Sequence, residues 1–107
     1  MTPAEFNALH FKKREEGAPN FAKNIVRHFE TKDGIQLSVQ ATSGHQCSPK
    51  ESGLPSYTHF EVAIYSQEAF PPFGEPVRVW GKTKVYHQVP VEVICDFINE
   101  HGGLLTG

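Results

Sequence analysis

The chain has 107 residues, of which 38% are hydrophobic, and its formal charge is −2 at pH 7. This length predicts one domain over residues 1–107 with a single modest core. The small negative charge provides no general attraction to nucleic acid or to an anionic membrane. No apolar run reaches the length of a membrane span, and the N-terminus lacks the apolar region of a signal peptide.

A helix is predicted at the start of the chain. Thr2 and Glu5 have the spacing of a capping box, and Pro3 suits the first helical position. Phe6 lies on an apolar face that is too narrow to hold the helix firmly by packing. We therefore expect residues 1–20 to form a peripheral or frayed helical segment.

The centre of the predicted sheet consists of two stretches with a period of two, Gly34–Ala41 and Tyr57–Ser66. In both, apolar residues alternate with polar ones, as in strands that bury one face. Val77–Trp80 and Thr83–His87 are predicted to form a hairpin about a Gly-Lys pair, which suits a type II′ turn.

An earlier strand is predicted over Asn24–Glu30, just before an Asp-Gly turn signal. Its pattern is compatible with two inward-facing pairs. One alternative buries Ile25 with Phe29, and the other buries Val26 with His28.

The final helix is predicted over Pro90–His101, with Pro90 at its first position and Gly102-Gly103 as its left-handed cap. Ile94 and Ile98 lie on a broad apolar stripe, so we expect them to pack on the sheet. The order of elements predicts an α+β fold. It is a small, mainly antiparallel sheet of three to five strands with the C-terminal helix packed across one face.

The proline-rich segment Gln67–Pro76 separates the central strands from the hairpin. Prolines at this density exclude regular structure, so the segment is predicted to cross the surface with Phe70 and Phe73 directed inward.

The long connection Thr42–Ser56 contains His45 and Cys47, and Tyr57 and His59 follow it. Loops of this length are usually functional or disordered. Because its residues are mostly polar, we expect a short linker to replace it without loss of folding. His45, Cys47 and His59 are residue types that bind zinc, and an imidazole could also activate Cys47 as a nucleophile. The chain has no second compact ligand pair and no cysteine-hydrolase signature, which favours a mobile or packed polar loop.

The two cysteines, Cys47 and Cys95, are too few for a disulfide framework, so we expect free thiols and a cytoplasmic location. Cys95 lies on the apolar stripe of the last helix and is predicted to be a small core residue. The scattered histidines are expected to be surface or capping residues: His10, His28, His87 and His101.

Arg78, Trp80, Lys82 and Lys84 combine cations with an aromatic ring in the predicted hairpin. Such mixtures bind single-stranded nucleic acid through phosphate contacts and base stacking. The alternative is a solvated hairpin whose lysines protect an exposed sheet edge. The negative formal charge favours this alternative.

Several short stretches in the strands, the long loop and the last helix carry a resemblance. They are Leu37–Ala41, His45, Cys47, Pro49, Phe60–Val62, Val85-Tyr86, Val89–Glu92, Ile98 and His101–Gly103. Together they resemble a group of small uncharacterised proteins encoded in bacteriophage and prophage genomes. The resemblance implies a genomic setting and no mechanism.

We expect a small non-enzymatic binding or accessory protein that acts through contacts with an unidentified protein, without cofactor, metal, nucleic acid or membrane. Its contact surfaces would be the Thr42–Ser56 loop and the segment Phe70–Trp80. One alternative is a metal-binding or thiol enzyme, and another is a nucleic-acid binder that uses the Arg78–Lys84 hairpin. The candidate binding residues are His45, Cys47, Tyr57, His59, Arg78 and Trp80.

Overall fold

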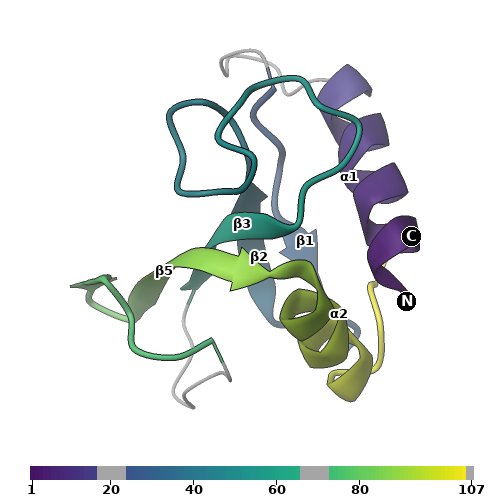
Figure 1. The fold of residues 1–107 in the computed structure, drawn as a ribbon. Coiled ribbons are helices and arrows are strands. Elements are labelled where there is room, and N and C mark those ends of the chain that lie inside the picture. Colours follow the sequence, from purple (N-terminus) through teal and green to yellow (C-terminus); the bar gives the residue numbers. More distant parts are fainter. Residues whose placement is uncertain (17–23, 66–72, 106–107) are drawn as a thin grey trace.

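The structure is a computed structural model that describes residues 1–16, 24–65 and 73–105. Its centre is a five-stranded antiparallel sheet in the order β1-β2-β3-β5-β4, with a C-terminal helix, as the sequence predicts (Figure 1). The elements are α1 (Pro3–Glu16), β1 (Phe29–Glu30), β2 (Gln36–Gln40), β3 (His59–Tyr65), β4 (Arg78–Trp80), β5 (Thr83–Pro90) and α2 (Val91–Glu100). Within the described ranges, no helix is long and apolar enough to cross a membrane.

One hydrophobic core lies between the helices and one face of the sheet. Alternate residues of β2 and β3 point into it, and both helices contribute side chains. Ile94 and Ile98 of α2 have no exposed surface, which confirms the predicted packing of this helix. The hydrophobic residues with no exposed surface are Phe6, Leu37, Val39, Ala41, Phe60, Val62, Ile64, Ile94 and Ile98.

Helix α1 begins with the predicted capping box. The Thr2 N–H donates to Glu5 Oε1 at 2.9 Å, and the Glu5 N–H donates to Thr2 Oγ1 at 3.2 Å. The expectation of a peripheral or frayed segment is wrong for residues 3–16, because Phe6 and His10 have no exposed surface. Residues 17–20 of that expected segment lie outside the described residues.

The predicted strand Asn24–Glu30 is reduced to Phe29–Glu30, and the buried pair is Val26 with Phe29, which matches neither alternative. The side chain of Gln40 explains why the strand is short. Its Oε1 accepts the Val26 N–H at 3.0 Å, and its Nε2 donates to the Val26 carbonyl at 2.8 Å. An amide side chain therefore satisfies the backbone groups that a neighbouring strand would otherwise pair.

The glycines at the predicted turn and helix cap have the positive φ values that these positions require. Gly81 has a φ of +58° in the two-residue turn between β4 and β5, as a type II′ turn requires. Gly102 and Gly103 have φ values of +87° and +89° after α2. The ring of Phe73 lies 5.4 Å from that of Tyr86, as expected for an inward-directed residue, whereas Phe70 lies outside the described residues.

Pro90 does not begin α2. It is the last residue of β5 and pairs with His59 of β3, with a φ of −59° and a ψ of 139°. The helix begins one residue later because the Val91 N–H donates to the Thr58 carbonyl at 2.9 Å. The strand therefore continues to the start of the helix.

Candidate functional site

The face of the sheet opposite the core is lined by the residues that alternate with the core residues. Ser38 of β2 is in register with Ala63 of β3, Ala63 with Val85 of β5, and Val85 with Arg78 of β4. We call this surface the open face. Small side chains at its centre leave a pocket of about 190 Å³. Its lining residues are Ser38, Gln40, Glu61, Ala63, Arg78, Trp80, Val85 and His87.

A neighbouring pocket of about 510 Å³ extends the open face toward β1. It shares Ser38 and Gln40 with the smaller pocket and is lined in addition by Arg27, His28 and Tyr65. The rings of His28 and Tyr65 lie 4.7 Å apart. The two pockets together therefore have small and polar side chains at their centre, with Trp80 at one end and His28 and Tyr65 at the other.

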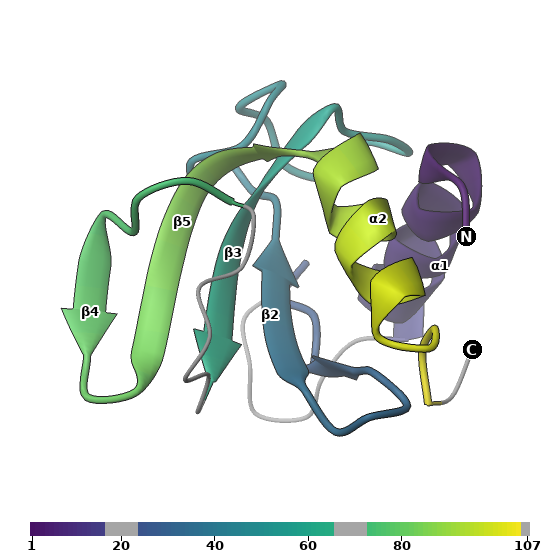
Figure 2. The same cartoon turned by 90° about the horizontal axis from the view of Figure 1, so that it is seen from below.

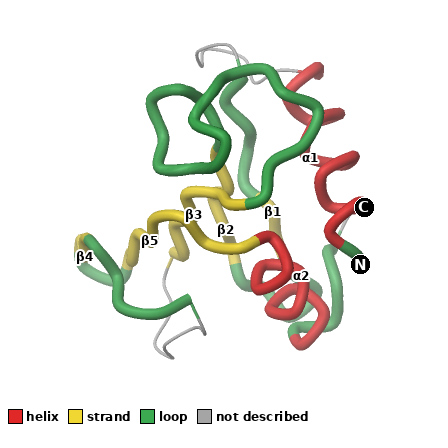
Figure 3. The backbone as a smooth tube through the Cα atoms, in the orientation of Figure 1, coloured by secondary structure: helices red, strands yellow, loops and turns green. Residues whose placement is uncertain are grey.

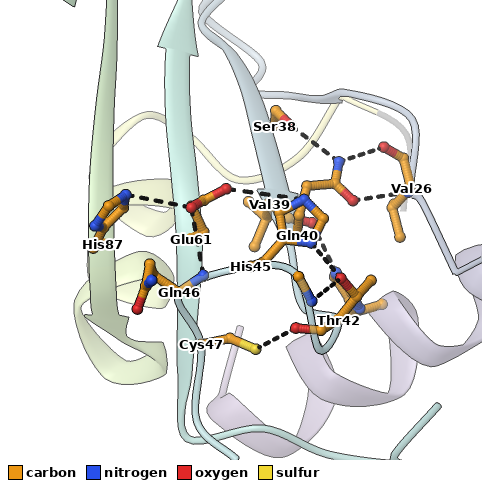
Figure 4. Close-up of polar contacts among 12 residues, drawn as sticks. Val26, Ser38, Val39, Gln40, Thr42, His45, Gln46, Cys47, Glu61 and His87 are labelled. Atoms are coloured by element: carbon orange, nitrogen blue, oxygen red, sulfur yellow. Dashed lines mark hydrogen bonds and ion pairs between the residues drawn. The ribbon is translucent and has the colours of Figure 1, made fainter. Parts of the chain in front are cut away.

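Among the residues that the structure describes, Glu61 of β3 is the only acidic one that lines the smaller pocket. Its Oε1 lies 3.4 Å from Nε2 of His87, and its Oε2 lies 3.9 Å from Nε2 of His45 (Figure 4). The Gln46 N–H donates to Oε1 at 3.4 Å. Because His45 and Gln46 belong to the long loop, this carboxylate connects the loop to the open face.

Cys47 points away from this cluster (Figure 4). The thiol is 1% exposed and donates to the carbonyls of Thr42 at 3.3 Å and Pro49 at 3.4 Å. Burial raises the pKa of Cys47, whereas a nucleophilic thiol needs a lowered pKa. The geometry therefore gives no support to a thiol enzyme.

The fold does not place the candidate zinc ligands His45, Cys47 and His59 around a common point. Over residues 1–16, 24–65 and 73–105, no group of three or more His, Cys, Asp or Glu side chains could hold a metal ion. The ring of His59 contacts the hydroxyl of Thr58 at 2.8 Å. His45 contacts the hydroxyl of Thr42 at 2.6 Å.

The long loop stands beside β3 and α1 (Figure 3), and it is held there by hydrogen bonds and by the buried Cys47. Gln88, at the unusual φ of +52°, donates from Nε2 to the Cys47 carbonyl at 2.9 Å, and its N–H donates to the Gln46 carbonyl at 3.0 Å. Tyr57 is 2% exposed, so its place is in the core. The expectation that a linker could replace the loop is not supported, because Cys47 of the loop helps to fill that core and the Glu51 carbonyl of the loop accepts the Tyr57 hydroxyl at 2.6 Å.

The basic and aromatic side chains of the predicted hairpin lie on both faces of the sheet. Arg78 and Trp80 share the open face, where the Arg78 Cζ lies 4.9 Å from the centre of the Trp80 ring. Lys84 alternates with Val85 along β5 and pairs with Val79, so it belongs to the opposite face. Trp80 is 61% exposed and Val79 is 54% exposed, and β4 lies at the sheet edge farthest from α1 (Figure 2).

Sequence reasoning missed the residues that complete the open face, among them Ser38, Glu61, Ala63 and His87. The alternation in the central strands places Ser38, Glu61 and Ala63 on the polar side, but the strand order decides which of them are neighbours. His28 and His87 are exposed and His101 caps α2, as expected, whereas His10 is buried.

Comparison with protein-family models, with curated proteins and with solved structures finds no match to this chain.

Proposed function

We propose that the protein is a small non-enzymatic binding protein that holds a segment of a partner protein on the open face. The observation that carries this proposal is Trp80, which is 61% exposed and stacked with Arg78 beside the smaller pocket. Tryptophan and arginine are enriched among the residues that dominate the energy of protein interfaces.

The charges of the open face favour a partner segment with a carboxylate beside an apolar side chain. Among the described residues, no acidic side chain forms an ion pair with Arg78, so its charge is available to a partner. Glu61 is already engaged by His45 and His87. An apolar side chain would lie against Val85 and the Trp80 ring, and the carboxylate would accept hydrogen bonds from Arg78.

Single-stranded nucleic acid is the second candidate, and the stacked pair of Arg78 and Trp80 favours it. One observation favours a protein instead. Lys84 lies on the other face of the sheet, so it adds no second cation beside Arg78 for the phosphates of a nucleic acid. The resemblance to phage-encoded proteins and the free thiols Cys47 and Cys95 support phage origin and a cytoplasmic location as parts of the same proposal.

The test is selection of random peptides displayed against the intact protein. We expect enriched peptides to pair an acidic residue with a neighbouring apolar one. Their affinity should fall by tenfold or more in Trp80→Ala, since a hot-spot residue contributes about 2 kcal/mol or more. Arg78→Ala should weaken the acidic peptides most, and Lys82→Ala, which changes the turn outside the pocket, should leave the affinity nearly unchanged.

Unchanged peptide affinity in Trp80→Ala would contradict the proposal. The same variants are tested with single-stranded oligonucleotides over a range of salt concentrations. Submicromolar affinity that falls steeply with salt and is lost in Trp80→Ala would favour the second candidate.

A further inference from the structure

Arg14 is a buried cation in the last turn of α1, remote from the open face. It is 6% exposed, and burial lowers its pKa. Among the described residues, its Nε and Nη2 atoms are buried and have no hydrogen-bond partner. Buried charged groups in native proteins are normally paired, because an unpaired one costs several kcal/mol. The Arg14 side chain therefore requires an explanation that the fold alone does not provide.

The two unpartnered atoms form a defined receptor. In a guanidinium group, the Nε–H and one Nη2–H point in the same direction, and this pair matches the two oxygens of a carboxylate or phosphate. A fork with both donors unpartnered is thus suited to bidentate binding of one oxyanion. A single buried water offers only one oxygen to the two N–H groups.

Aromatic rings surround the guanidinium. The Arg14 Cζ lies 5.2 Å from the centre of the Tyr57 ring and 5.3 Å from that of Phe11. Tyr57 is 2% exposed and is fixed by Asn7, whereas Phe11 is 38% exposed. The guanidinium therefore contacts an inner ring that is held in place and an outer ring that reaches solvent. Because the donor atoms are covered, an entering anion must displace a covering group.

One turn earlier, His10 is also buried, and its Nδ1 atom has no hydrogen-bond partner among the described residues. Its Nε2 donates to the Val39 carbonyl at 2.8 Å, so Nδ1 is the unprotonated acceptor of a neutral ring. A neutral imidazole contributes no charge opposite to that of Arg14. It also provides an acceptor on the same side of α1 for a protonated oxygen of a ligand.

We propose that Arg14 binds an oxyanion, a carboxylate or a phosphate group, through its Nε and Nη2 atoms between the rings of Tyr57 and Phe11. This site is independent of the open face, because it lies on α1 and involves none of the residues that line the two pockets there.

The experiment measures the thermal unfolding midpoint of the whole chain as sodium acetate or sodium phosphate replaces sodium chloride at constant ionic strength. Above the Kd, each tenfold rise in the bound anion should raise the midpoint by roughly 5–11 °C for a chain of this size. A response to acetate alone identifies a carboxylate, and a response to phosphate alone identifies a phosphate group.

Arg14→Met removes the fork and should abolish this response, and Arg14→Lys should abolish it too, because an ammonium group lacks the parallel donors. Arg27→Met changes an exposed arginine and should retain the full response. In the wild-type protein, the NMR resonance of the Arg14 Nε–H should shift during the same titration, which tests the site even if a variant does not fold. An equal rise in Arg14→Met and the wild type, or no rise and no resonance shift, would overturn the proposal.

Discussion

His10 is a polar residue that serves as part of the hydrophobic core. Its ring has no exposed surface, lies 4.9 Å from the ring of Phe60 and donates a hydrogen bond to the Val39 carbonyl. Burial lowers the pKa of His10 to about 4, and the nearby charge of Arg14 acts in the same direction. The residue was expected at the surface because a lone histidine in a helix of mixed polarity carries no sign of burial.

The stability of the protein should therefore depend on His10 as the pH falls. The unfolded residue has a pKa of about 6.5, above the folded value, so the unfolded state takes up a proton first. The contribution is fully present above the unfolded pKa and is lost as the pH falls toward the folded pKa. We expect the free energy of unfolding to fall by about 2 kcal/mol from this residue between pH 7 and pH 5, as measured by urea denaturation.

The matched variants separate this effect from other acid-sensitive groups. His10→Gln keeps an N–H donor for the Val39 carbonyl but cannot titrate, so its free energy of unfolding should change less between the two pH values. His28→Gln, at an exposed histidine, should keep the wild-type pH dependence. An identical pH dependence in His10→Gln and the wild type would refute the assignment.

At the scale of elements, polar groups add to the packing of Phe6 in attaching α1 to the rest of the molecule. Asn7 accepts the Tyr57 N–H at 2.8 Å and donates to the Tyr57 carbonyl at 3.1 Å. These bonds resemble those of a strand pair, but a helix side chain provides them. They hold the end of the long loop against α1.

Asn7→Ala should destabilise the protein by about 2–4 kcal/mol, because two buried backbone groups of Tyr57 lose their partner. Asn99→Ala provides the control, since its bonds to Met1 are exposed and their loss should cost less than about 1 kcal/mol. Chemical denaturation of both variants measures the two costs. Equal losses would mean that the bonds to Tyr57 are not what secures α1.

At the scale of the whole molecule, α2 covers one face of the sheet, and the open face lies on the opposite side. Its buried residues, which include Ile94 and Ile98, share one core with β2, β3 and α1. A single core under one face explains why the opposite face carries charged, small and aromatic side chains, with no second layer of helices in the part of the chain that the structure describes.

Ile98→Ala should lower the free energy of unfolding by about 2–5 kcal/mol, as large-to-small substitutions in a core do. Leu105→Ala removes a comparable apolar group that is 54% exposed, and it should change stability by less than about 0.5 kcal/mol. Thermal and urea unfolding provide the comparison. A small loss for Ile98→Ala would place α2 away from the sheet.

Much of the fold could be predicted because its signals are local. The capping box of Thr2 and Glu5, the alternation in β2 and β3, and the apolar stripe of α2 each depend on residues within a few positions of one another. Local spacing fixes which side of a strand or helix is apolar. The predicted α+β architecture followed from these signals and from the short turns that favour antiparallel pairing.

By itself, therefore, the sequence determined the two helices, the central strands and the hairpin, and it determined which faces of β2, β3 and α2 are apolar. The tertiary structure decided the remainder, namely the polar attachment of α1, the pairing of Val26 with Gln40, and the cluster of Glu61 with His45 and His87. These contacts join residues 14 to 50 positions apart, and most are made by side chains rather than by a regular backbone pattern. Strand order and register bring such residues together, and no local spacing records either of them.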